Sequence, residues 1–210
     1  MKIAFLGIGN VGFAIANNLQ KAGYSIIVGT NDMSSKSIVK AKQRNQAFEY
    51  ASPQQAIDAA DEVVFLSTPF QANKQVLEGL KFGGKTLVDC TNPVGPGLTH
   101  GLNNVQSGSE MVQELAADAN VVKAFSIYGF ENFVDSSFPA YNVKPAMLIA
   151  GNDNTAKLQA GILIEALGYQ TVDTGALHQA LHLEHMTLLW VKMARVNGHH
   201  PNFVWAYLEK

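Results

Sequence analysis

The sequence predicts an α/β fold, doubly wound, in which helices cover both faces of a mainly parallel sheet. Short apolar segments, typical of strands buried on both faces, alternate with segments of helical period along most of the chain. A glycine-rich hexapeptide joins the first predicted strand to the first predicted helix. Residues 174–210 break the alternation and are predicted to form a C-terminal helical extension. Since no linker or repeat interrupts the pattern, we expect residues 1–210 to form a single domain.

The first half of the chain contains most of the predicted sheet. Apolar runs predict strands at residues 3–6, 26–28, 47–51, 62–67 and 85–90. Helical periods predict helices at residues 11–19, 36–44 and 71–80, and a further helix that starts after residue 52. Ser52, Pro53 and Gln55 form the signature of a capping box with proline in the first turn. Gly83 and Gly84 are expected to end the helix of residues 71–80.

The second half is predicted to add three strands, at residues 120–125, 146–151 and 169–172, and a helix at residues 154–167. A loop rich in glycine and proline, residues 92–101, precedes a further helix. We interpret Glu110, Glu114 and Asp118 as a solvated acidic face of that helix. Right-handed crossovers would place the helices on both faces of the sheet.

The C-terminal helix, residues 186–196, is apolar nearly all round, because only Thr187, Lys192 and Arg195 are polar. Such a helix must be buried on several sides. We therefore predict a homodimer in which each copy of the helix covers the other, with Trp190 as an anchor. The alternative is that the tail, residues 197–210, folds back over the same helix.

The composition excludes several classes of protein. A formal net charge of −2 over 210 residues leaves no basic surface for nucleic acid. The single cysteine, Cys90, excludes an internal disulfide and is typical of a reducing compartment. The apolar start is broken by Gly7, and no apolar run approaches the ~18 residues of a membrane span. We expect a soluble, cytoplasmic protein with no membrane or nucleic-acid partner.

The hexapeptide "GIGNVG" follows a predicted strand and opens a helix, which is the context that the G-x-G-x-x-G fingerprint requires. Gly7 would permit the tight turn, Gly9 the approach of a pyrophosphate, and Gly12 the close packing of helix on sheet. The segment therefore predicts a Rossmann-type dinucleotide-binding domain, with the phosphates at the helix N-terminus.

The second strand indicates which dinucleotide binds. In NAD-specific proteins an acid at the end of this strand bonds the ribose 2′-hydroxyl and repels a 2′-phosphate. Here Thr30 and Asn31 stand at that point, and Lys36 follows within reach of a phosphate. Asp32 lies two residues beyond Thr30, and residues 30–36 contain no arginine, the side chain that binds a phosphate best. The segment favours NADP over NAD.

Six short segments, "FLGIGNVG", "IIVGTN", "STP", "TNPV", "VKAF" and "DTGAL", occur in the order and spacing of a known family. On these segments the chain resembles the NADP-dependent oxidoreductases that reduce or oxidise a deazaflavin coenzyme. Their relatives include the cytosolic reductase domain of the six-transmembrane metalloreductases. The resemblance covers nearly the whole chain. It implies an enzyme that transfers hydride between NADP(H) and a flavin-like or deazaflavin acceptor, a small molecule.

The resemblance also implies where the cofactor lies. The pyrophosphate would contact Ile8, Gly9, Asn10 and Val11; the adenosine phosphate Thr30, Asn31 and Lys36; and the nicotinamide ribose Ser67, Thr68, Pro69, Asn92 and Pro93. One position departs from the family, because members that use NADP commonly carry arginine where Asn31 stands.

The segment "SIYGFENF", residues 126–133, is expected beside the hydride acceptor. Ser126, Tyr128 and Phe130 are the residues we assign to it. The rings of Tyr128, Phe130 and Phe133 would either stack on a tricyclic ring system or pack in the core. Hydride transfer between two ring systems needs little acid–base help, so no catalytic residue is named.

Other interpretations stay open. His178, His182 and His185 share a helical face and could contact a metal, the acceptor or another surface, although we expect no metal. The nucleotide-binding domains of β-hydroxyacid and imino-acid dehydrogenases begin alike, but their long helical second domain has no counterpart in the remaining residues. A reductase of a small organic substrate or ferric chelate, or a non-catalytic NADP-binding redox sensor, completes the alternatives.

Overall fold

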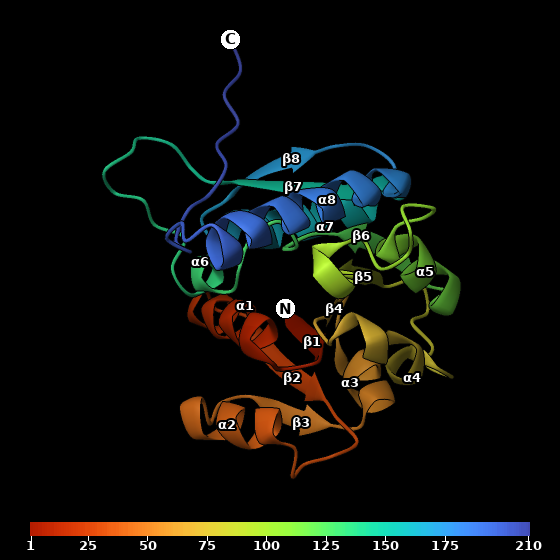
Figure 1. Ribbon diagram of the computed structural model, residues 1–210. Coiled ribbons are helices and arrows are strands. Elements are labelled where there is room, and N and C mark those ends of the chain that lie inside the picture. The colour runs from red at the N-terminus through yellow and green to blue at the C-terminus, as the bar shows by residue number, and fades with distance from the viewer.

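The computed structural model describes residues 1–210 and contains one eight-stranded sheet (Figure 1). The strands are β1 (Lys2–Leu6), β2 (Ser25–Gly29), β3 (Glu49–Ala51), β4 (Val63–Leu66), β5 (Thr86–Asp89), β6 (Asn120–Lys123), β7 (Ala146–Gly151) and β8 (Gln170–Asp173). Their spatial order is β3-β2-β1-β4-β5-β6-β7-β8, and only the β6–β7 pair is antiparallel. The first six strands have the order of a doubly wound dinucleotide-binding sheet. The predicted fold class is confirmed.

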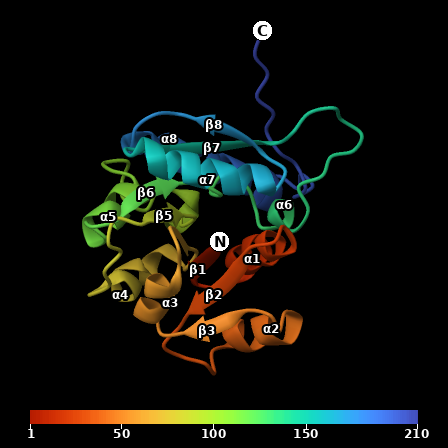
Figure 2. The same ribbon diagram turned by 180° about the vertical axis from the view of Figure 1, so that it is seen from behind.

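Helices cover both faces of this sheet, with α8 in front of it in Figure 1 and α7 in front in Figure 2. The helices are α1 (Asn10–Lys21), α2 (Lys36–Arg44), α3 (Pro53–Ala59), α4 (Asn73–Leu77), α5 (Gly108–Leu115), α6 (Glu131–Val134), α7 (Asn154–Ala166) and α8 (Ala180–Val191). Short 3₁₀ turns occupy Phe70–Ala72, Pro96–Leu98 and Leu177–Gln179, and a π-helical turn, Lys192–Val196, extends α8.

The core consists of two clusters, which lie on opposite faces of the sheet at β1, so that β1 contributes to both. Ile3 and Phe5 belong to the cluster that includes α1 and α2, whereas Ala4 and Leu6 belong to the cluster that includes α3 and α5. Successive side chains of a strand point to opposite faces, so a strand covered on both faces is apolar throughout. This explains the unbroken apolar runs of the first half.

Two local predictions about helices need correction. The helix predicted to run to residue 80 and to be ended by Gly83 and Gly84 ends at Leu77, because Glu78 leaves the helical region with a ψ of 121° and Gly79 follows with a φ of 76°. The predicted acidic face is limited to Glu110 and Glu114, because α5 ends at Leu115. Asp118 lies beyond the helix and accepts the Phe82 and Gly83 N–H groups at 2.8 and 2.9 Å. These bonds lower the pKa of Asp118.

The C-terminal tail folds back over the end of α8. Trp190 is 2% exposed, and its ring stacks on Phe203 with centroids 5.6 Å apart. The carbonyl of Trp205 accepts the Ala146 N–H at the start of β7 at 2.8 Å. The structure therefore adopts the alternative in which the tail covers this helix, and Trp190 is not available as an anchor for a second copy. The chain contains no helix with both the length and the apolar character needed to cross a membrane.

Candidate functional site

The glycine fingerprint joins β1 to α1 at the carboxyl edge of the sheet. Gly7 has a φ of 98°, and a Cβ there would lie 2.7 Å from the Ser67 carbonyl carbon. A Cβ on Gly12 would clash with Ser67 Oγ and lie 2.6 Å from the Gly7 carbonyl oxygen. The fold itself therefore requires both of these glycines.

Gly9 differs from the other two glycines of the motif. It is exposed, and a Cβ added to it would have no heavy atom within 4 Å. It is also the N-cap of α1, where no side chain caps the helix and the first turn, starting with Asn10 and Val11, carries no acid. Free N–H groups and the positive end of the helix dipole suit a phosphate. The residues present thus fit a pyrophosphate that approaches the backbone at Gly9.

Beside the fingerprint lies a hollow of about 300 Å³. Its lining includes Gly7, Ile8, Gly29, Thr30, Asn31, Asp32, Ser35 and Thr68. The structure thus brings the predicted Thr30 and Asn31 together with the fingerprint. Asp32, the only acid on the lining, is engaged in its own turn, because its Oδ1 accepts the Ser34 N–H at 2.8 Å and the Ser34 hydroxyl at 2.6 Å. These bonds lower the pKa of Asp32.

The residues after β4 hold the fingerprint and the neighbouring loop in place. Ser67 Oγ donates to the Gly7 carbonyl at 2.8 Å. Thr68 lines the hollow, and its Oγ1 donates to Asn73 Oδ1 at 2.8 Å. Pro69 is exposed at the same edge. Ser67 therefore has a structural role, because it bonds the Gly7 carbonyl, and its position in the sequence does not indicate this role.

The residues after β5 are tied to α8. Asn92 Oδ1 accepts the Thr187 hydroxyl at 3.0 Å, and the same hydroxyl lies 2.8 Å from the Ser126 carbonyl. Asn92 Nδ2 also lies 3.4 Å from that carbonyl. Pro93, the next residue, is buried. The C-terminal helix therefore positions the loop that was predicted to border the nicotinamide ribose.

A buried charged cluster lies beneath this loop, and its centre is Lys123 at the end of β6. The Lys123 side chain is 0% exposed, with Nζ 3.3 Å from Asp89 Oδ2 and 3.1 Å from Glu184 Oε1. It also donates to the Thr91 carbonyl. Burial lowers the pKa of Lys123, but the two carboxylates outweigh burial and leave that pKa above its ordinary value.

Glu184 connects the cluster to two further segments. Its Oε2 lies 2.7 Å from His100 Nε2 and accepts the Gly108 N–H at 3.0 Å. Ser109, the next residue of α5, donates its hydroxyl to Asp89 Oδ2 at 2.6 Å. The cluster thus joins the strand ends, the 92–101 loop, the start of α5 and the middle of α8. Sequence reasoning missed it, although Asp89 and Lys123 are the only charged residues of β5 and β6, and each follows two apolar residues.

The segment assigned to the acceptor is less accessible than predicted. Tyr128 is 5% exposed, and its hydroxyl donates to the Ala146 carbonyl at 2.5 Å and accepts the Trp205 N–H at 3.1 Å. Burial raises its pKa. Ser126 is 1% exposed, and its hydroxyl has no partner. Phe133 is in the core, whereas Phe130 is half-buried. The expectation that the Tyr128 ring faces an acceptor is not met, because that ring packs in the core.

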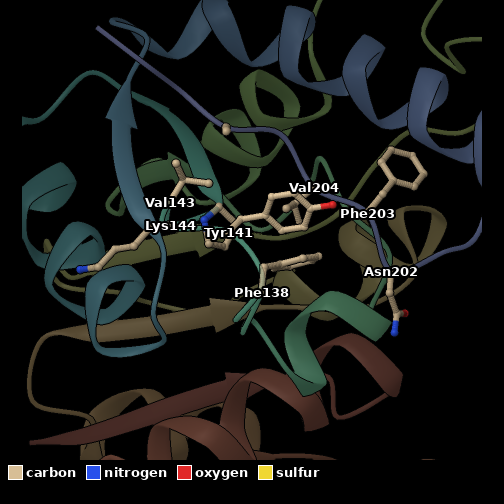
Figure 3. Close-up of a pocket in the computed structure, with 9 residues that line it drawn as sticks. Phe138, Tyr141, Val143, Lys144, Asn202, Phe203 and Val204 are labelled. Carbon is tan, nitrogen blue, oxygen red and sulfur yellow. The ribbon is translucent and has the colours of Figure 1, made fainter.

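A larger hollow, of about 390 Å³, lies near β7, far along the sheet from the fingerprint (Figure 3). Phe138 and Tyr141 from the loop before β7, and Phe203 and Val204 from the tail, line it. No residue predicted for the site lies there.

The three histidines that were predicted to share a helical face are not placed to hold a metal ion together. His178, His182 and His185 are all exposed. No group of three or more histidine, cysteine, aspartate or glutamate side chains is placed to hold a metal ion.

Comparison with known proteins gives consistent matches. Residues 2–93 match the family described as "NADP oxidoreductase coenzyme F420-dependent". The chain is 29% identical over 212 residues to the F420-dependent NADP reductase of Methanothermobacter marburgensis, with 92% of each protein covered. It is 26% identical over 189 residues to the metalloreductase STEAP3 of Rattus norvegicus, covering 89% of this chain and 36% of that protein. A crystal structure from Arthrobacter sp. FB24, provisionally described as an F420-dependent NADP reductase, matches with a TM-score of 0.84, 25% identity and full coverage of both chains.

Proposed function

We propose that the chain belongs to the family of F420-dependent NADP oxidoreductases and that it transfers hydride between NADP(H) and a flavin-like or deazaflavin acceptor. The observation that carries the proposal is the open backbone at Gly9, where the fold leaves room for a pyrophosphate and needs no glycine of its own. The uncharged side chains of Thr30 and Asn31 on the lining of the hollow beside the fingerprint, with the Asp32 carboxylate engaged by Ser34, support NADP over NAD.

In this proposal the nicotinamide ring supplies or accepts the hydride when the cofactor is bound. The first turn of α1 binds the pyrophosphate, and Thr68, Asn92 and Pro93 border the nicotinamide ribose. Thr187 fixes the Asn92 side chain, so that residue meets its ligand already oriented. Phe130 is the one half-buried ring of the 126–133 segment, and it is the contact we propose for the acceptor.

A ferric chelate is the second candidate for the acceptor. Its support is the similarity to a protein named as a metalloreductase, of which this chain spans about a third. Against it, the similarity to the NADP reductase extends over nearly the whole of both proteins. We therefore place the deazaflavin first.

The acceptor is tested by following the loss of NADPH absorbance with a deazaflavin, a flavin and a ferric chelate in separate assays. We expect turnover to be fastest with the deazaflavin and absent in a Gly9→Val variant. Faster turnover with the ferric chelate would select the second candidate. NADPH binding without turnover of any acceptor would contradict the enzyme and indicate a redox sensor.

A homodimer remains part of the proposal, with a contact that does not use Trp190. Tyr141, Leu189 and Val196 are 68%, 50% and 65% exposed, and a second copy of the chain would cover such side chains. Sedimentation at micromolar concentration is expected to give a dimer mass for the wild type and a shift towards monomer for Tyr141→Ser. A monomer mass for the wild type contradicts the proposal.

A further inference from the structure

Helix α2 presents three positive side chains along one face. Lys36, Lys40 and Arg44 follow each other at intervals of four residues, so they lie one above another on the helix. Together with Gly9 and Phe13 they line a hollow of about 150 Å³ between α2 and the start of α1. This hollow is separate from the hollow of about 300 Å³ at Thr30 and Asn31, which we call the adenosine hollow, but adjoins it, because Ile8 and Ser37 line both.

None of the three cations has an acidic partner in the structure. The ion pairs of the chain involve Lys2, His100, Lys123, Lys157 and Arg195. The Arg44 guanidinium instead lies over the Phe13 ring, 3.8 Å from its centroid, and is held at the wall of the hollow. Lys42, on another face of α2, lies over Tyr50 at 4.9 Å. The unpaired charge is thus concentrated on the face towards α1.

The direction of the side chains brings this charge towards the nucleotide. Side chains of an α-helix point back towards its N-terminus. The N-terminus of α2 follows the end of β2, so the side chains of Lys40 and Arg44 lean towards the end of α2 that is nearer to Thr30 and Asn31, while lining the adjoining hollow. Asn31 is uncharged, and the only charged residue on the adenosine hollow is the acid Asp32. The cations that could neutralise a phosphate there come from α2.

We propose that Lys40 and Arg44, with Lys36, bind the 2′-phosphate of NADP(H) and determine the preference for NADP over NAD. The inference rests on the proposed function and adds two specificity-determining residues to it. A phosphate monoester carries close to two negative charges at neutral pH. The planar guanidinium of Arg44 can bond two of its oxygens at once, and the lysines add point charges.

The test compares two nucleotides that differ by the 2′-phosphate, 2′,5′-ADP and 5′-AMP, by titration calorimetry. The variants are Lys40→Gln and Arg44→Gln, and Lys42→Gln is the matched control because it removes a charge from the same helix on another face. The side chains of Lys40 and Arg44 are exposed, so both variants are expected to fold, as circular dichroism would verify. Each variant should bind 2′,5′-ADP about tenfold more weakly, since a charge-assisted bond is lost. Binding of 5′-AMP and all binding by Lys42→Gln should be unchanged.

The outcomes separate the inference from the proposed function. If the wild type binds the two nucleotides equally, the preference for NADP fails, and the inference fails with it. If the wild type prefers 2′,5′-ADP but both variants keep that preference, the inference is overturned while the NADP preference stands. If the variants lose affinity equally for both nucleotides, their charges serve the 5′-phosphate, which also overturns it.

Discussion

Around β1, β2 and β4 the candidate site is made largely of backbone, whereas around β5, β6 and α8 it is made of buried side chains. In the first region the key feature is the absence of a side chain at Gly9 and of a cap on α1. In the second, Lys123 and Glu184 meet across 61 residues of sequence, and His100 and Glu184 across 84. Backbone features depend on a few consecutive residues, so substitutions in the first region should affect binding or stability independently of one another. In the second region, loss of one side chain of the buried cluster should destabilise the whole cluster.

The largest effect on cofactor binding is expected from Gly9→Val. Its side chain would occupy free space in the chain alone but would fill the volume that a pyrophosphate needs. NADPH affinity should fall by at least about 100-fold, which is ~2.7 kcal/mol of binding free energy, while the melting temperature stays near that of the wild type. Fluorescence titration with NADPH and thermal melting by circular dichroism measure the two quantities.

The matched control for that experiment is Gly12→Val, in the same motif. Its side chain would meet Ser67 Oγ and the Gly7 carbonyl, so we expect a loss of folding stability together with binding. If Gly9→Val unfolds the protein as well, or binds NADPH normally, the distinction between an open and a closed glycine is wrong.

The largest effect on folding stability is expected from Lys123→Met in the side-chain region. The change leaves Asp89 and Glu184 buried without their counter-charge, and it should lower the free energy of unfolding by about 3–5 kcal/mol. Urea titration measures the change. The control is Lys157→Met, which breaks a pair with the exposed Asp173 and should cost about 0–1 kcal/mol. Similar losses in the two variants would show that the cluster behaves like a surface pair.

The same contrast decides how much of the molecule could be predicted from its sequence. The strands, the fingerprint and the helix of residues 36–44 depend on apolar period and on local glycine and cap signals, and these were predicted nearly residue by residue. Glu184, the partner of Lys123, could not be predicted, because no local signal indicates that a helix 61 residues later lies over the strand ends. The surroundings of Tyr128 could not be predicted for the same reason, since Ala146 and the distant tail supply the partners of its hydroxyl.

A smaller effect, with a pH dependence, is expected from Tyr128→Phe. Loss of the hydroxyl leaves the Trp205 N–H and the Ala146 carbonyl without this partner, and should lower the free energy of unfolding by about 1–3 kcal/mol at neutral pH. Burial raises the pKa of Tyr128, so the fold favours the neutral phenol. The contribution of the neutral Tyr128 phenol to the free energy of unfolding is fully present below the ordinary tyrosine pKa of about 10, and it is lost as the pH rises above that value.

The stability gap between the wild type and Tyr128→Phe should therefore narrow above pH ~10. Tyr169, whose pKa burial also raises, is present in both proteins and provides the common background. Urea titrations from neutral to alkaline pH measure the gap, and tryptophan emission reports whether the tail has been released. A gap that stays constant or widens with pH would contradict the buried, neutral phenol.

The smallest effect compares the same change in the two regions, Ser52→Ala and Ser107→Ala. Each serine begins a capping box, with its N–H and hydroxyl donating to Gln55 Oε1 at 3.3 and 2.9 Å, or to Glu110 Oε2 at 2.8 Å for both. Each variant should lose about 1 kcal/mol of stability.

Ser107→Ala should nevertheless lower the free energy of unfolding more than Ser52→Ala, for two reasons that lie in the surroundings of Ser107. Its hydroxyl oxygen also accepts the Glu110 N–H at 3.1 Å, and the next N–H group of the chain, that of Gly108, holds the Glu184 carboxylate. Loosening the start of α5 therefore weakens the buried cluster, whereas the start of α3 supports no such group. Urea titration of both variants gives the difference, which we expect to be several tenths of a kcal/mol. In a Lys123→Met background the difference should shrink, because the cluster that couples Ser107 to α8 is already broken. Equal losses in the wild-type background would mean that the cap and the cluster are independent.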